Sequence, residues 1–264
     1  MSKTRIVFVH GLDGFGAAAW PAQHLLAGRY DALFLKRSGF DAFAEPTATN
    51  FFSDARIVAD ALGAGGHVVA HAQGAIAAMM AAVEHPHLVR SLTLVEPALT
   101  SLTAELPATM AYREHLEPLF ARRTELSDED FAREYYRLTA APGGAGSGGY
   151  RSGVSGTVGA GSGRTVTGSA QGLESVGRVA ARLRLQSPSW EAPLHIVPGV
   201  PTLVLTGGWE PLYEEVADYL ATTGARHVVS RGGHRPQDTE EGAGIIGSFI
   251  AETQARVTGG QLRG

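Results

Sequence analysis

Short apolar runs that are each closely followed by glycine or proline constrain the fold of this chain most strongly. They are rich in β-branched residues and too short for buried helices, which is typical of strands buried on both faces. The runs cover residues 6–9, 67–70, 92–95, 201–206 and 227–230. Helical patterns at residues 54–62, 76–83 and 212–221 lie between them. Strands alternating with helices pair in parallel, so the sequence predicts an α/β fold with a mostly parallel sheet flanked by helices.

The alternation stops in the middle of the chain. Residues 99–198 show only helical patterns, at 106–122, 127–140 and 173–185. We therefore expect a core formed by residues 1–98 and 199–264, and a helical cap or lid inserted between these two parts. Ser127 and Asp130 stand three residues apart, which nearly forms a capping box at the start of the second helical pattern.

The predicted cap contains a Gly-rich loop at residues 142–177. Glycine, serine, threonine and alanine dominate it, and it has few large aliphatic residues. Such a segment buries too little apolar surface to offset its chain entropy. The composition leaves two interpretations open, a lid loop or a disordered linker.

The segment His67–Ala75 joins the end of a predicted strand to the start of a predicted helix. Its small residues Ala70, Gly74 and Ala75 suit a tight and strained turn. A serine at position 72 would complete the strand, turn and helix of a nucleophile elbow. This chain carries Ala72 instead.

Three further loops follow predicted strands, in the order that one family uses. They read His-Gly-Leu-Asp-Gly at 10–14, Thr-Gly-Gly-Trp-Glu-Pro at 206–211 and Gly-Gly-His-Arg-Pro at 232–236. With the elbow, these motifs resemble the α/β-hydrolase superfamily over nearly the whole chain. The resemblance implies an α/β-hydrolase fold in which Ala72 occupies the nucleophile position, Glu210 is the acid and His234 is the general base.

The resemblance also implies the remaining site residues. The backbone N–H of Leu12 or Asp13, together with that of Gln73, would form the oxyanion hole. We expect His71 and Trp209 to contact the substrate. Two alternatives stay open: these two side chains could instead only pack within the fold, and Asp13 could serve only in a turn.

The acid also has an alternative. Glu96 follows the predicted strand 92–95 and is the rival of Glu210. Aspartate is commoner than glutamate at the position of Glu210, which is a mild departure from the family pattern.

Alanine at position 72 limits the chemistry, because a methyl group cannot attack a carbonyl. Losing the serine of such a triad costs about 10⁶-fold in kcat, while the oxyanion hole retains roughly 10³–10⁴-fold over water. Two interpretations compete. In the first, which the intact surroundings favour, alanine replaces a natural serine and the chain is an inactivated variant. In the second, alanine is natural.

The first interpretation predicts a serine-type hydrolase of a small carboxylic ester, lactone or thioester. The second leaves His234 for acid–base chemistry, as in a lyase or decarboxylase, or leaves a pocket that only binds a ligand. An intact pair of Glu210 and His234 would favour catalysis, because a binding protein has no need for an oriented histidine.

Composition excludes several other classes of protein. The formal net charge is -4, which gives no basic surplus for binding nucleic acid. Cysteine is absent, so disulfides and thiolate ligands are excluded. No apolar run is long enough for a membrane span or a signal sequence. We expect a cytoplasmic monomer or homodimer that acts on a small molecule, without a cofactor and without a metal site.

Overall fold

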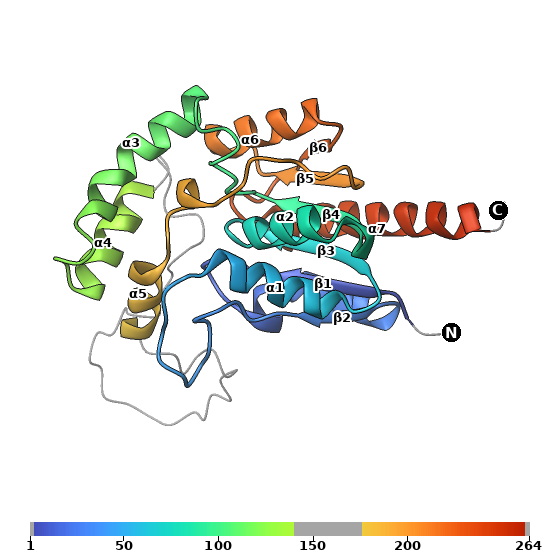
Figure 1. Ribbon diagram of the computed structural model, residues 1–264, viewed down its shortest axis with the longest axis horizontal. Helices are drawn as coiled ribbons and strands as arrows, with labels where there is room; N and C mark the ends of the chain where they lie inside the picture. The colour runs from blue at the N-terminus through green and yellow to red at the C-terminus, as the bar shows by residue number, and fades with distance from the viewer. Residues whose placement is uncertain (1–2, 140–175, 262–264) are drawn as a thin grey trace, which may run out of the picture.

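The computed structural model describes residues 3–139 and 176–261. Its centre is a six-stranded sheet with the order β2-β1-β3-β4-β5-β6, in which every neighbouring pair is parallel (Figure 1). The strands are β1 (Arg5–Val9), β2 (Asp31–Phe34), β3 (Gly66–His71), β4 (Val89–Val95), β5 (Thr202–Thr206) and β6 (Arg226–Val229). The predicted α/β class with a parallel sheet is confirmed.

Helices cover both faces of this sheet. The α-helices are α1 (Phe51–Leu62), α2 (Gly74–Glu84), α3 (Pro107–Ala121), α4 (Asp128–Thr139), α5 (Val176–Leu185), α6 (Pro211–Thr222) and α7 (Glu240–Gln261). Short 3₁₀ segments lie at Gly16–Ala19, Pro21–Gly28, Pro86–Leu88, Ser189–Glu191 and Pro236–Asp238. The sequence patterns did not single out β2 or α7. The first is a partly exposed edge strand whose short apolar run contains no β-branched residue.

The side chains of the central strands alternate between two apolar layers. Val7 and Val9 of β1 pack in one buried cluster with residues of α1, α2 and α6. Ile6 and Phe8 point the other way and pack with Trp20 and with residues of α7. Both layers are apolar and buried, and this burial on both faces explains the continuous apolar runs in the sequence.

Three helices lie apart from the sheet layers. Figure 1 shows α3, α4 and α5 beside the ends of the strands that lie opposite the N-terminus of the chain. They share a small apolar cluster that includes Leu116, Phe131 and Leu183. The helices α3 and α4 confirm two of the helical patterns predicted in the insertion, and the Ser127 hydroxyl caps α4 by accepting from the Asp130 N–H at 3.1 Å.

The structure tests the other expectations for the insertion only in part. The helix α5 matches the part of the third pattern that the structure describes. The Gly-rich loop lies almost entirely outside the described residues, and the boundaries of the cap stay a prediction.

A buried ion pair ties the first loop of the site to the layer beneath it. Arg37 donates from Nε to Asp54 of α1 at 3.0 Å, and both side chains are almost fully buried. The same guanidinium donates to the Gly11 carbonyl at 3.2 Å and to the Gln186 side chain at 3.2 Å, so it also reaches the residue after α5. This network fixes the loop that follows β1.

Within the residues that the structure describes, no helix combines the length and the hydrophobicity needed to cross a bilayer.

Candidate active site

Ala72 lies in a sharp turn between β3 and α2. Its φ of 48° is in the left-handed region, which L-residues with a Cβ rarely adopt. Backbone hydrogen bonds to the end of β4 and the segment after it hold the turn. The Ala72 N–H donates to the Val95 carbonyl at 2.9 Å, and the Ala72 carbonyl accepts from the Ala98 N–H at 3.2 Å. This is the strained strand-to-helix turn that the sequence predicted.

Two glycines allow the loop after β1 to approach this turn. A Cβ on Gly74 would lie 2.5 Å from the His10 carbonyl oxygen, so no larger residue fits there without a backbone shift. A Cβ on Gly11 would lie 3.1 Å from the Ala72 methyl carbon. The loop of residues 10–14 therefore packs directly against the nucleophile position.

The candidate oxyanion donors lie around this contact. Leu12 and Asp13 follow Gly11, and Gln73 follows Ala72 at the N-cap position of α2. Among the described residues, no backbone or side-chain acceptor is found for the N–H groups of Leu12, Asp13 and Gln73. Free N–H groups beside the turn suit an oxyanion hole, which stays a prediction for all three residues.

His10 supports the loop from within. Its Nδ1 donates to the Gly11 carbonyl at 2.9 Å, while its Nε2 accepts from the Arg37 N–H at 3.1 Å. Burial, together with the nearby Arg37, lowers the pKa of His10 to about 3, so this ring is neutral at physiological pH. It is a structural histidine.

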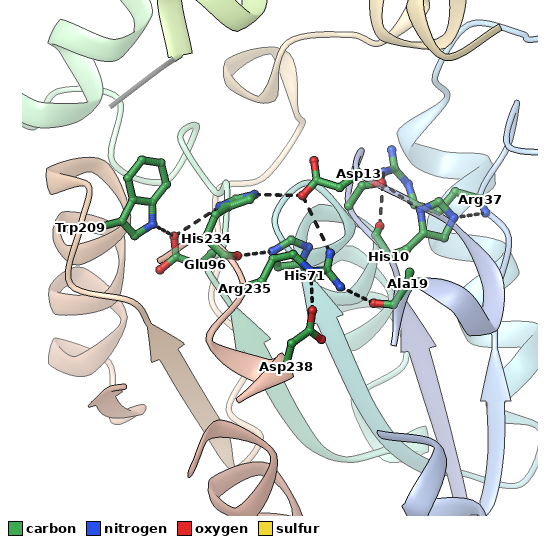
Figure 2. Close-up of polar contacts among 11 residues, drawn as sticks. His10, Asp13, Ala19, Arg37, His71, Glu96, Trp209, His234, Arg235 and Asp238 are labelled. Carbon is green, nitrogen blue, oxygen red and sulfur yellow. Dashed lines mark hydrogen bonds and ion pairs between the residues drawn. The ribbon is translucent and has the colours of Figure 1, made fainter. Parts of the chain in front are cut away.

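Glu96 is the carboxylate beside His234. It follows β4 with a φ of 47° and has no exposed surface. Its Oε1 accepts from the Gly207 N–H at 2.6 Å, and its Oε2 accepts from the Trp209 indole N–H at 2.7 Å. The same Oε2 lies 3.4 Å from Nδ1 of His234, as Figure 2 shows.

Glu210 does not make the contact expected of it. Among the described residues, no hydrogen bond or ion pair joins its side chain to His234, whose partners are Glu96 and Asp13. The physical reason is its place in the chain, because Glu210 is the N-cap residue of α6, one position past Trp209, whose ring lies beside His234. We therefore replace Glu210 with Glu96 as the candidate acid.

His234 stands between two carboxylates. Its Nδ1 faces Glu96, and its Nε2 lies 3.8 Å from Oδ2 of Asp13. This ring is only partly exposed and lies against aromatic neighbours, with Trp209 at a centroid distance of 5.9 Å and Tyr213 at 5.3 Å. A hydrogen bond from Nδ1–H to Glu96 would leave the lone pair of Nε2 available as a base.

His71 is bonded within the fold. Its Nε2–H donates to the His234 carbonyl at 2.8 Å, which links the loop after β6 to the end of β3. Burial, then the nearby His234 and Arg235, holds the pKa of His71 well below its usual value. Its contact with a substrate stays a prediction, as does that of Trp209, whose indole N–H is engaged by Glu96.

Tyr213 is a neighbour of the site that the motifs did not indicate. It belongs to the first turn of α6, three residues after Glu210, and its ring lies beside His234. Burial, then the nearby Glu96, raises the pKa of Tyr213 well above its usual value, so the phenol is protonated. Its helical spacing from the loop was the only signal in the sequence.

Comparison with known proteins identifies the family. A model described as "Alpha/beta hydrolase family" matches residues 6–245. The chain belongs to this family. The matched region includes Ala72, Glu96 and His234. Comparison with curated proteins gave no sequence match.

Solved structures share the fold of this chain. NosK from Streptomyces actuosus is 18% identical with a TM-score of 0.59, covering 96% of this chain and 100% of that one. A structure from a study of carboxylesterases of Nitrososphaera gargenis is 12% identical with a TM-score of 0.62, covering 96% and 92%. An esterase from Thermogutta terrifontis is 15% identical with a TM-score of 0.55, covering 96% and 91%. These likenesses confirm the predicted alpha/beta hydrolase fold.

Proposed function

We propose that this chain carries the site of an enzyme that hydrolyses a small carboxylic ester, lactone or thioester, with Ala72 where the nucleophile would stand. The observation that carries the proposal is the pairing of His234 with the buried Glu96 beside the strained turn at Ala72. A carboxylate that orients a histidine in this way supports a role for the ring as a base.

The reaction would then proceed without a covalent intermediate. Nε2 of His234 would take a proton from a water molecule, whose oxygen attacks the carbonyl carbon of the substrate. The N–H groups of Gln73 and of Leu12 or Asp13 would stabilise the oxyanion that forms. Collapse of this tetrahedral intermediate would break the bond between the carbonyl carbon and the alcohol oxygen or thiol sulfur, and that leaving group would take the proton from His234. A general base contributes roughly 10²–10⁴-fold, and an oxyanion hole with binding retains about 10³–10⁴-fold over water. We therefore expect slow turnover.

Two structural neighbours support an ester as the substrate class, because one comes from a study of carboxylesterases and the other is an esterase. A second candidate follows from Ala72. Since His234 is paired with Glu96 while no hydroxyl stands at position 72, His234 could serve a lyase or decarboxylase. A protein that only binds a ligand is disfavoured, because it has no use for a buried carboxylate directed at a histidine.

An assay of the purified chain and its His234→Ala variant on esters, lactones, thioesters and β-keto acids tests the proposal. We expect slow release of acid from at least one ester-type substrate, with the activity lost in the variant. Carbon dioxide release from β-keto acids alone would favour the second candidate. Ester turnover that persists without His234 would overturn both.

A further inference from the structure

Asp13, His71 and His234 bring three metal-ligating groups together at one edge of the sheet. They belong to the segments that follow or end β1, β3 and β6, and Figure 2 shows them gathered above the strands. One ligand atom from each residue lies within 4.8 Å of those of the other two. Two imidazoles and one carboxylate are a donor set that suits first-row divalent cations.

The hydrogen bonds around both histidines match those of metal ligands. His71 donates from Nε2 to the His234 carbonyl at 2.8 Å, and Nδ1 of His234 lies 3.4 Å from Glu96. Histidines that bind metal ions commonly give their other ring N–H to a carbonyl or a carboxylate, which fixes the tautomer. Here each ring has one of these two acceptors, which leaves lone pairs on Nδ1 of His71 and Nε2 of His234.

The position of the carboxylate completes the arrangement. Oδ2 of Asp13 lies 3.8 Å from Nε2 of His234, which is too long for a hydrogen bond. Atoms that bind one tetrahedral Zn²⁺ at about 2.0–2.2 Å lie roughly 3.3 Å from one another. Side-chain shifts of about 1 Å would therefore bring the three groups to bonding distance.

Arg235 is a cation that lies beside this cluster and does not block it. Its Nη1 lies 3.9 Å from Asp13, whereas its Nε donates to Asp238 at 2.6 Å and its Nη2 donates to the Ala19 carbonyl at 2.7 Å. The two short contacts hold the guanidinium in place. The long contact to Asp13 is the weakest of the three.

Alanine at position 72 affects the availability of the lone pair on Nε2 of His234. A serine hydroxyl in the elbow would donate to Nε2 of the base, as nucleophiles of this kind do. The methyl group of Ala72 cannot, so it leaves Nε2 of His234 without that competitor.

We propose that Asp13, His71 and His234 form a binding site for a first-row divalent cation of the zinc type. This proposal goes beyond the proposed function and does not depend on it. The cation would take the lone pair of His234 that general-base catalysis needs, so cation binding and that catalysis exclude each other.

Direct titration tests the site. The tag-free full chain, stripped with a chelator and dialysed, is titrated with Zn²⁺ by calorimetry and with Co²⁺ by visible absorption. We expect one saturable site and a Co²⁺ spectrum that shows nitrogen ligation. Because losing an outer-shell partner alone costs roughly 10–100-fold in metal affinity, Asp13→Asn and His71→Asn should each weaken binding by at least that factor.

The matched control removes a histidine pair at the C-terminal end of α2. The rings of His85 and His87 lie 6.2 Å apart, and a His85→Asn/His87→Asn variant should keep the affinity unchanged. If His71→Asn loses its circular dichroism spectrum, the partly exposed His234→Gln takes its place. No saturable binding, or unchanged affinity in Asp13→Asn with loss in the control, would overturn the proposal. The titrations contain no substrate, so failure of the hydrolase proposal would not affect them.

Discussion

The carboxylate of Glu96 lies 3.4 Å from Nδ1 of His234, although 138 residues separate the two in the chain. The contact is longer than an ordinary hydrogen bond, and the same oxygen accepts a shorter bond of 2.7 Å from the Trp209 indole. Catalytic hydrogen bonds are often long without substrate and shorten when it binds. Trp209 thus holds the carboxylate in the position from which it can orient the histidine.

Replacing each of the two candidate acids by glutamine distinguishes their roles. Glu96→Gln should lower kcat of the His234-dependent reaction by roughly 10²–10⁴-fold, because the neutral amide no longer stabilises a protonated imidazole. Glu210→Gln should leave kcat close to that of the parent chain. Steady-state kinetics of both variants would measure the difference. A larger loss with Glu210→Gln would return the acid role to that residue.

Restoring a hydroxyl at the elbow should open the covalent path. Ala72→Ser is expected to raise turnover of short activated esters by several orders of magnitude with little change in affinity, because the hydroxyl acts in the covalent step and contributes little to ground-state binding. The gain should disappear in an Ala72→Ser/His234→Ala variant, which lacks the base. An Ala72→Ser chain that stays inert on every ester, lactone and thioester would instead favour the lyase candidate.

The buried pair of Arg37 and Asp54 should dominate the stability of the loop after β1. Asp54→Ala leaves the guanidinium without its partner inside the protein, and we expect a loss of about 3–5 kcal/mol in the free energy of unfolding. Asp60→Ala is the matched control in the same helix. Asp60 faces Arg56 at 4.0 Å on the exposed surface, so its loss should cost no more than about 1 kcal/mol. Equal midpoints in urea for the two variants would contradict this prediction.

Acid should destabilise the fold through its buried histidines. Burial lowers the pKa of His10 to about 3, while an unfolded histidine titrates near its usual 6.5. Between these two pH values the unfolded chain binds one more proton at His10 than the folded chain does. The free energy of unfolding is therefore unaffected by His10 above about pH 6.5. Below that pH it should fall by about 1.4 kcal/mol per pH unit as the pH falls toward 3.

Burial likewise lowers the pKa of His67 and His71, which adds to the effect in the same direction. Urea denaturation at a series of pH values would measure the slope, and a folded His10→Gln variant should show a shallower one. An unchanged slope in that variant would assign the acid sensitivity to other groups.

Local sequence patterns alone determine the framework of this protein. The β-branched runs predict buried strands, because both faces of a parallel sheet are covered. The small residues around Ala72 predict a tight turn, because larger side chains would not fit in it. The sequence also indicated His234 as the candidate base, since a glycine pair and a histidine after a late strand form a local pattern.

Tertiary structure decided which side chains meet. Glu96 and Glu210 both follow strands, and the loop motif favoured Glu210. In the structure, Glu96, which has a left-handed φ, lies beside His234, whereas Glu210 is the N-cap residue of α6. The meeting of Asp13, His71 and His234 likewise depends on the segments that end or follow β1, β3 and β6, which are distant in the chain. Strand order and loop conformation are long-range properties, and no local pattern of residues encodes them.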